Sequence, residues 1–151
     1  MARFPKALVA ALSHGKSVAR TGWLNSNWHV EAQQIAGFQF PHLLRVTDGE
    51  HPYVWTTVTA DDLISDDWVY LDGSQIEDFA VTEGTFASAA ELLFNGNKVR
   101  RSSWLPQMHI EIFDDPNYGR LALINLPNGT KRTYNPDAKD LTSTNWERYT
   151  G

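Results

Sequence analysis

One unusual phrase occurs twice in this chain. Residues 17–31 read SVARTGWLNSNWHVE, and residues 98–111 read KVRRSSWLPQMHIE. Each copy places Val, one residue, Arg, two residues, Trp-Leu and later His, one residue, Glu in the same order. Because Trp is a rare residue, chance is a poor explanation for this match. Internal repetition therefore has to be tested before any other fold hypothesis.

The match extends over nearly the whole chain when residues 85–149 are aligned with residues 3–71. Between the two copies lies an acidic stretch that ends in glycine, which is typical of a linker or a short connecting strand. We interpret the chain as a tandem duplication, with a first repeat at residues 1–73, a linker at 74–84 and a second, more diverged repeat at 85–151. The aligned identical pairs include Phe4 with Phe86, Leu12 with Leu93, Gly15 with Gly96, Val18 with Val99, Arg20 with Arg101, Trp23 with Trp104, Asp62 with Asp140, Leu63 with Leu141, Ser65 with Ser143 and Trp68 with Trp146.

The first part of each repeat predicts a helix followed by strands. Gly15 and Gly96 stand where a glycine usually ends a helix. The segments HVEA and MHIEIF then change to a period of two, which indicates strands. The apolar residues that recur at helical spacing before the glycines are Phe4, Leu8 and Leu12 in one repeat and Phe86, Ala90 and Leu93 in the other.

The second part of each repeat predicts a hairpin, a helical turn and a last strand. Tight-turn dipeptides, Asp48-Gly49 and Asn128-Gly129, each separate two strand-like segments. The segments DDLISDDW and KDLTSTNW predict a short helix, and the final strands are expected at residues 69–71 and 147–149. The predicted fold class is therefore α+β, with two tandem copies of a small unit, each an N-terminal helix packed on an antiparallel β-sheet.

Composition excludes several classes of protein. An apolar share of 42% and a charged share of 21% are typical of a soluble globular chain, and no apolar run approaches a membrane span. The absence of cysteine excludes disulfides and cysteine-ligated metals, which favours an intracellular protein. A net charge of −5 argues against a broad nucleic-acid-binding face. A small anionic ligand stays possible, because it needs only a local cluster of Arg and Lys.

Trp23 and Trp104 allow two interpretations. Each could be a core residue that closes the helix onto the sheet, or a platform on which a base or sugar ring stacks. Arg20 and Arg101 lie three residues before them. A guanidinium in that position can hold a phosphate through two parallel hydrogen bonds, which favours a role in ligand binding.

Two His-x-Glu pairs place His and Glu on the same face of a strand. They are His29 with Glu31, directly after Trp28, and His109 with Glu111. His-x-Glu begins the zinc deaminase signature, but that signature also needs cysteines, which this chain lacks. No third ligand has a telling spacing, so we predict no metal site. The simpler interpretation is a pair of exposed or hydrogen-bonded strand residues.

Acidic residues at the predicted short helices also have two interpretations. Asp62 and Asp140 fit helix caps, although paired carboxylates could also carry out acid–base chemistry. The Asp66-Asp67 pair of the first repeat becomes Thr144-Asn145 in the second, which argues against shared catalysis. The sequence shows no glycine-rich phosphate loop, no Ser-His-Asp order and no nucleophilic Cys. We predict that the protein is not an enzyme and needs no cofactor.

The first repeat resembles the second Thoeris anti-defence family, which consists of small phage proteins. The residues that carry the resemblance are FPKALVAALSHGKSVARTGW, FPHLLRVTDG, YVW and DDLISDDW, and the second repeat retains VRRSSW, NGT and KDLTSTNW. The resemblance implies oligomeric α+β domains that bind cyclic ADP-ribose-type immune signals, or in some relatives cyclic oligonucleotides, without cleaving them. It also implies a pocket between subunits with the motif Trp as one wall. The ligand-binding set predicted on this basis is Trp23, Trp104, Arg20, Arg101, Trp28, His29, His109 and Asp62.

The fused pair of repeats implies that one chain does the work of two subunits. A homodimer would then imitate a tetramer of single units, in the cytoplasm of an infected bacterial host. The family usually follows Gly-Trp with a glycine-containing loop, whereas this chain has LNSNW and LPQM, and Ser103 replaces Gly22. The ligand is therefore expected to differ from the typical one, or one repeat to have lost its pocket.

Two other functions stay open at this point. The protein could be a phage interaction or structural module whose Trp residues form core and interface, without any nucleotide ligand. It could also hydrolyse the signal through His29, Glu31 and the Asp residues of the short helix.

Overall fold

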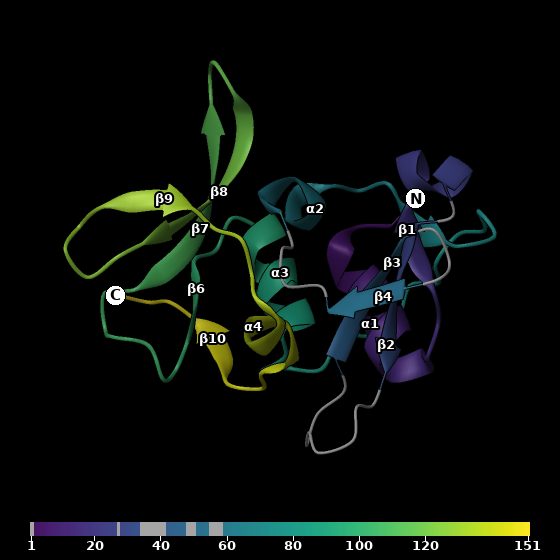
Figure 1. Ribbon diagram of the computed structural model, residues 1–151. Coiled ribbons are helices and arrows are strands. Elements are labelled where there is room, and N and C mark those ends of the chain that lie inside the picture. Colours follow the sequence, from purple (N-terminus) through teal and green to yellow (C-terminus); the bar gives the residue numbers. More distant parts are fainter. Residues whose placement is uncertain (1, 27, 34–41, 48–50, 55–58) are drawn as a thin grey trace. The chain divides into compact units, whose positions relative to one another are not determined.

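The computed structural model describes residues 2–26, 28–33, 42–47, 51–54 and 59–151 (Figure 1). The chain divides into two compact units, Met1–Thr56 with Ser65–Val81, and Thr57–Ile64 with Thr82–Gly151. Each unit contains a five-stranded antiparallel sheet and helices, which confirms the α+β fold class. No helix in the described ranges has the length and apolar character needed to cross a bilayer.

The first unit begins with its helix and continues into its sheet. The strand order in space is β4-β3-β2-β1-β5, and all neighbouring strands are antiparallel. The elements are α1 (Phe4–His14), β1 (Val18–Arg20), the 3₁₀ helix η1 (Thr21–Ser26), β2 (His29–Gln33), β3 (His42–Thr47), β4 (His51–Val54) and β5 (Trp68–Tyr70).

The second unit repeats this topology. Its strand order is β9-β8-β7-β6-β10, which becomes the order of the first sheet when each strand is replaced by its repeat equivalent. The elements are α2 (Ala60–Ile64), α3 (Phe86–Phe94), β6 (Val99–Arg101), β7 (His109–Asp115), β8 (Gly119–Asn125), β9 (Lys131–Thr133), α4 (Ala138–Thr142) and β10 (Trp146–Arg148).

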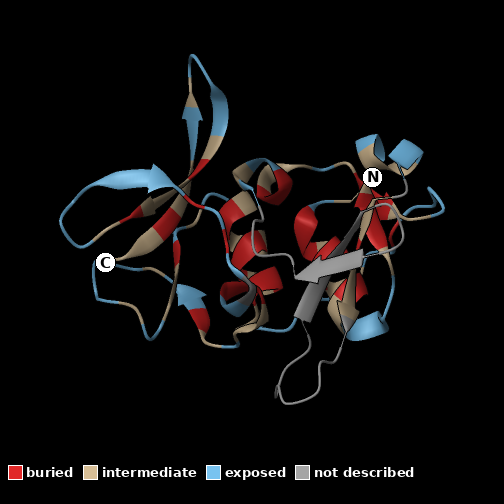
Figure 2. Ribbon diagram, in the orientation of Figure 1, coloured by how far each residue is buried: buried red, intermediate tan, exposed pale blue. Residues whose placement is uncertain are grey.

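The long helices pack on their sheets through an apolar face rich in alanine (Figure 2). Alanine lets the helix backbone approach the sheet closely, and the phenylalanine at each helix start fills the remaining space. The helical spacing predicted from the sequence is confirmed, although Leu12 is only half-buried. The buried residues are Phe4, Pro5, Ala7, Leu8, Ala10 and Ala11 in α1, and Phe86, Ala87, Ala89, Ala90 and Leu93 in α3.

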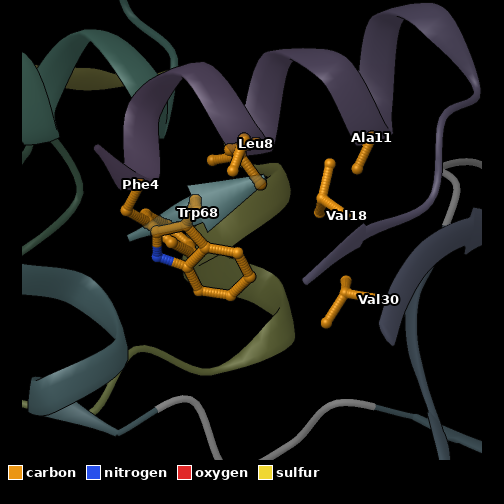
Figure 3. Close-up of a pocket in the computed structure, with 7 residues that line it drawn as sticks. Phe4, Leu8, Ala11, Val18, Val30 and Trp68 are labelled. Atoms are coloured by element: carbon orange, nitrogen blue, oxygen red, sulfur yellow. The ribbon is translucent and has the colours of Figure 1, made fainter. Parts of the chain in front are cut away.

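A small void lies inside the first core, between α1 and the sheet (Figure 3). Its volume is about 10 Å³, which leaves room for at most one water molecule. The lining is entirely apolar, and it includes Trp68 and Val30. The void is therefore a packing gap and not a ligand pocket.

The prediction that glycine caps both long helices is confirmed for α1 and is wrong by one residue for α3. Gly15 is the C-cap of α1 in the left-handed conformation, with φ 64°. In α3 the cap is Asn95, and Gly96 follows it with φ 88°. At the other end of α3, the hydroxyl of Thr85 accepts a hydrogen bond from the backbone N–H of Ser88 at 3.3 Å.

The predicted strands are confirmed, with one shift in the bounds. The hairpin around Asn128-Gly129 joins β8 to β9, and Gly129 has φ 85°. The dipeptide Asp48-Gly49 lies outside the described residues. The final strands begin one residue earlier than predicted, at Trp68 and Trp146, because these residues pair with β1 and β6 through their backbones.

The backbones of Trp68 and Trp146 also form hydrogen bonds on the side that faces away from β1 and β6. Trp68 exchanges two 3.0 Å hydrogen bonds with Ala2, and the N–H of Trp146 donates to the carbonyl of Gly84 at 2.9 Å. Gly84 has φ 88°, and a Cβ there would lie 2.7 Å from the carbonyl oxygen of Thr144. Only glycine fits this close approach.

The connecting segment at residues 74–84 forms no strand. Instead it packs on α1, where the ring of Phe79 stacks on His14 with centroids 4.2 Å apart. Lys6 of α1 forms a 2.9 Å ion pair with Asp78. Ile76 is buried, so this segment adds to the core of the first unit.

The short helix α2 has the sequence of the first repeat but belongs to the second compact unit. It contacts β8, Leu63 is buried, and the N–H of Ala60 donates to Oδ1 of Asn135 at 2.9 Å. Its repeat equivalent, α4, packs against α3. Residues 57–64 therefore belong to the first repeat by sequence but to the second compact unit by contacts. The boundaries of the two repeats, 1–73 and 85–151, stay a prediction.

Replacing Leu63 with alanine should destabilise the second unit and leave the first intact. Removing a buried leucine side chain costs about 2–5 kcal/mol. Amide hydrogen exchange should therefore lose protection in β7 and β8, while β1 and β2 keep theirs. Leu8→Ala in α1 is the matched control and should give the reverse pattern. Loss confined to β1 and β2 in Leu63→Ala would contradict the assignment of α2.

Candidate ligand-binding site

A perpendicular pair of tryptophans lies in the first unit. Trp68 is fully buried, and the ring of Trp23 in η1 meets it with centroids 5.4 Å apart and an interplanar angle of 81°. Phe4 of α1 contacts the same indole at 5.6 Å (Figure 3). Such T-shaped contacts contribute about 0.5–1.5 kcal/mol beyond the burial of the rings. Trp68 therefore connects the helix, the sheet and Trp23.

The second unit contains the same arrangement. Trp146 is buried, and Trp104 meets it with centroids 5.3 Å apart and an interplanar angle of 75°. Phe86 contacts Trp146 at 5.1 Å. The indole N–H of Trp146 donates to the carbonyl of Asp140 at 2.9 Å, which satisfies the only polar group of this ring.

Two kinds of Trp are thus present in each unit. Trp68 and Trp146 are core residues, whereas Trp23 and Trp104 are only partly buried. The sequence left open whether Trp23 and Trp104 are core residues or stacking platforms. In both units the ring of the partly buried Trp packs against a core Trp, and the rest of its surface faces solvent. A flat ligand could stack on a ring held in this way.

Arg20 is held by a carboxylate within its own unit. Its Nε donates to Oδ1 of Asp67 at 3.0 Å and its Nη2 to Oδ2 at 3.5 Å. The hydroxyl of Thr21 also donates to Oδ2 of Asp67, at 3.4 Å. Because Asp67 directly precedes Trp68, this pairing joins the start of η1 to the strand that carries the core Trp.

Arg101 bonds an amide oxygen as well as a carboxylate. Its Nε donates to Oδ1 of Asn145 at 3.0 Å and its Nη1 to Oδ1 of Asp140 at 3.4 Å. Within the described part of the chain, Nη2 of Arg101 has no hydrogen-bond acceptor. Asp140 also accepts a 2.9 Å hydrogen bond from the buried hydroxyl of Tyr134.

This network shifts the ionisation of its members. Burial raises the pKa of Asp140, and the nearby charge of Asp137 adds to the effect. The hydrogen bond from Tyr134 and the charge of Arg101 oppose this shift but do not cancel it. Burial, followed by the negative charge of Asp140, raises the pKa of Tyr134 well above its ordinary value.

The two His-x-Glu pairs have different partners. His29 Nε2 lies 3.7 Å from a carboxylate oxygen of Glu31. His109 instead stacks on Tyr149 with centroids 4.1 Å apart, and its Nδ1 lies 2.9 Å from the carbonyl oxygen of Gln107. In these described contacts His29 faces its own Glu31, whereas His109 faces Tyr149 and Gln107.

Glu111 is the centre of a small charged group in the second unit. It accepts hydrogen bonds from Lys131 at 2.8 Å and Asn125 at 3.3 Å, and Lys98 lies 3.6 Å away. Burial alone would raise its pKa, but the contacts with Lys131, Asn125 and Lys98 outweigh that effect and lower it. Among the described residues, no three His, Asp or Glu side chains are grouped so that they could hold a metal ion.

Asp62 and Asp140 belong to capping boxes, but they are not the caps themselves. The N-cap of α4 is Asp137, which accepts from the N–H of Asp140 at 2.7 Å. In α2, Thr59 accepts from the N–H of Asp62 at 3.1 Å, and the Asp62 carboxylate accepts from the N–H of Thr59 at 3.2 Å. The prediction that Asp62 and Asp140 are the caps is therefore wrong by three residues. In a capping box the residue at the third helical position also bonds back to the cap, so an acidic residue is favoured there as well.

The loops after the two arginines differ in form. In the first unit the chain forms η1, which carries Trp23. In the second it forms a turn, in which the N–H of Trp104 donates to the carbonyl of Arg101 at 3.0 Å. Gly22 has no positive φ and open space around its missing Cβ, so Ser103 at the equivalent position is tolerated without strain. Trp28 lies in the coil between η1 and β2, half-buried.

The contacts of Asp67 with Arg20, of Asn145 with Arg101 and of Tyr134 with Asp140 were not predicted from the sequence. A signal was present, because Asp67 and Asn145 each stand directly before the second Trp of their repeat. What the sequence does not contain is the strand register, which places Arg20 opposite Trp68 and Arg101 opposite Trp146.

An open hollow of about 420 Å³ lies at the other end of β1, away from Trp23. A hydrogen bond joins the hydroxyl of Tyr70 to Glu77 inside it. Partial burial and this hydrogen bond raise the pKa of Tyr70 to about 12, and the same bond lowers the pKa of Glu77. The predicted site residues are not part of its lining, which consists of Lys16, Ser17, Tyr70, Leu71, Asp72, Ser74 and Glu77.

Asp140 should titrate above its ordinary pKa of 3.8 and Glu111 below its ordinary pKa of 4.5. Asp140 therefore contributes stability at acidic pH that is lost as the pH rises through its raised pKa. Glu111 contributes stability above its ordinary pKa that is lost as the pH falls through its lowered one. Carboxyl ¹³C NMR titration measures both values.

Matched variants separate the causes. Arg101→Gln should raise the pKa of Asp140 further, and Lys131→Met should raise that of Glu111. An Asp140 that titrates at or below 3.8 in the intact protein would contradict this prediction and show that Tyr134 and Arg101 outweigh burial.

Comparison with known proteins agrees with this repeated arrangement. A family model described as the Thoeris anti-defense 2-like domain matches residues 2–71 and, a second time, residues 84–149. A search of curated proteins finds no match. The two matches together cover most of the chain and correspond to the two copies of the Trp pair. This chain therefore belongs to the Thoeris anti-defense 2-like family and carries the family's domain twice in tandem.

Proposed function

We propose that this protein binds and sequesters a host immune signalling nucleotide, a cyclic ADP-ribose derivative or a cyclic oligonucleotide, without cleaving it. Membership in an anti-defence family supports a role against Thoeris defence. The observation that carries the nucleotide ligand is the fixed, partly exposed Trp present in each unit, Trp23 in one and Trp104 in the other.

A nucleobase is a suitable partner for such a ring. Stacking of a base on an aromatic side chain contributes about 1–3 kcal/mol. The perpendicular contact with Trp68 or Trp146 restrains the platform before the ligand arrives. Less conformational entropy is then lost on binding, which favours affinity.

The arginines are proposed to act close to the rings. Arg101 keeps its Nη2 donors for a ligand phosphate, while its other nitrogens are fixed by Asn145 and Asp140. Arg20 is held by both oxygens of Asp67, so its direct contribution is expected to be smaller. Its main effect would be to hold the start of η1, and with it Trp23.

The remaining predicted residues have supporting roles in this proposal. Trp28, His29 and His109 are half-buried and lie near the start of β2 or β7. Asp62 stabilises α2 through its capping box. We infer that a homodimer forms in the cytoplasm of the infected host, where one chain with two repeats stands for two single units.

Trp23→Ala and Trp104→Ala should each weaken binding of the cognate nucleotide by about 5- to 150-fold at its own site, which corresponds to the loss of about 1–3 kcal/mol of stacking. Thermal melting against cyclic ADP-ribose isomers and cyclic di- and trinucleotides identifies the ligand first. Saturating ligand should add about 3–4 kcal/mol of stability, a shift of several degrees. Calorimetry then compares the variants.

Leu105→Ala is the matched control, since Leu105 is 58% exposed and next to Trp104. It should leave folding unchanged. If the double Trp variant folds and still binds every ligand of the panel with unchanged affinity, the site assignment is wrong.

The bound nucleotide should be recovered intact. A protein that stores its ligand releases the same molecule when the complex is denatured by heat, whereas an enzyme releases a product. Chromatography and mass spectrometry of the released material after long incubation make this comparison. A linear or hydrolysed product that accumulates in proportion to protein would overturn sequestration and favour hydrolysis.

The second candidate function is a protein-interaction module. The observation in its favour is the exposure of three large apolar side chains in the second unit. They are Leu105, Phe113 and Tyr118, with 58%, 46% and 80% of their surfaces exposed. Two of them lie on or beside the β7–β8 hairpin. This function predicts no melting shift with any nucleotide of the panel.

A further inference from the structure

Arg100 of β6 binds the loop that carries Trp104. Its Nε donates to the carbonyl of Arg101 at 3.2 Å, and its Nη1 donates to the carbonyl of Pro106 at 3.4 Å. Its Nη2 donates to the carbonyl of Trp104 itself. All three nitrogens of one guanidinium therefore donate to backbone carbonyls within residues 101–106.

The guanidinium is largely withdrawn from solvent. The Arg100 side chain is 15% exposed, and its Nε lies 3.8 Å from a carboxylate oxygen of Glu147 on the neighbouring strand β10. Burying a charge is costly unless it is paired and hydrogen-bonded. Glu147 and the three carbonyls together provide that compensation, so this position of Arg100 is a specific one.

The loop has no other regular structure to hold it. Residues 102–108 contain no glycine and form turns, in which the N–H of Met108 donates to the carbonyl of Leu105 at 2.9 Å. Asn145 adds a 3.2 Å hydrogen bond from its side-chain amide to the hydroxyl of Ser103. Without Arg100, the carbonyls of Trp104 and Pro106 would lose their side-chain donors.

The first repeat does not use this device. Ala19 occupies the position of Arg100, and the chain after Arg20 forms the 3₁₀ helix η1. A 3₁₀ helix satisfies backbone carbonyls by its own i to i+3 bonds. An arginine in one repeat thus replaces a short helix in the other.

We propose that Arg100 is a positioning residue for the second ligand site, which sets the orientation of the Trp104 ring and turns the loop carbonyls away from the ligand. The site that results presents the ring of Trp104, an apolar surface suited to the face of a nucleobase. The two repeats then bind through platforms of different rigidity and chemistry. This role rests on the ligand role of Trp104 proposed above.

The test needs a signal from Trp104 that does not depend on any ligand. Labelling with 5-fluorotryptophan gives one ¹⁹F NMR resonance for each of the six Trp residues, and Trp104→Phe assigns the one that matters. Arg100→Ala should move or broaden the Trp104 resonance while the resonances of Trp23 and Trp68 stay in place. Arg132→Ala, which removes an exposed arginine of β9, is the matched control and should change none of the three.

Arg100→Lys tests geometry against charge. A lysine ammonium cannot span three carbonyls as a planar guanidinium does, so the Trp104 resonance should again differ from that of the unaltered protein. Full recovery of the resonance by lysine would overturn the positioning role and leave only a charge effect. An unchanged Trp104 resonance in Arg100→Ala would overturn it as well.

Binding gives the second readout, with cyclic ADP-ribose as the probe. The affinity of the second site should fall about tenfold in Arg100→Ala, whereas the affinity of the first site stays unchanged. Trp23→Ala should instead weaken the first site and leave the affinity of the second unchanged. If Trp104→Ala has no effect on binding but Arg100→Ala still moves the Trp104 resonance, the ligand role of Trp104 is wrong while the contact itself stands. If the resonance moves and the second-site affinity does not, the positioning role is wrong and the ligand role stands.

Discussion

The perpendicular contact between a buried and a half-exposed tryptophan is the interaction on which each unit depends. Trp68 and Trp146 belong to edge strands, and each is fixed by backbone hydrogen bonds on both sides. Each receives a phenylalanine from the long helix and a second Trp from the loop after the neighbouring strand. One indole therefore closes the core and also supports the candidate site, so changes in core packing would be transmitted to the platform.

Much of the fold could be predicted from the sequence, because local signals determine it. The apolar spacing of Phe4 and Leu8, the glycine at position 15 and the alternation around Ile110 each report the conformation of a few neighbouring residues. The duplication then doubled the amount of information, since a feature that occurs in both repeats is seldom accidental. Fold class and family followed from these signals.

The site was harder to predict, because long-range pairing determines it. Nothing local distinguishes the core Trp68 from the half-exposed Trp23, and only the register of β1 and β5 brings Asp67 to Arg20. Arg100 was passed over for a similar reason. Its partners are backbone carbonyls, which every residue has, so they leave no trace in the sequence.

The location of α2 has a consequence for synthesis on the ribosome. The helix and its buried Leu63 emerge before β8, against which α2 packs, has been made. At about 5–20 residues per second, the ribosome needs about 3–12 s to add the roughly 60 residues between them. During that interval the apolar side of α2 has no sheet to cover it. The first repeat therefore cannot fold completely until the second repeat has been synthesised. During that interval, α2 is a target for a chaperone that binds exposed apolar segments.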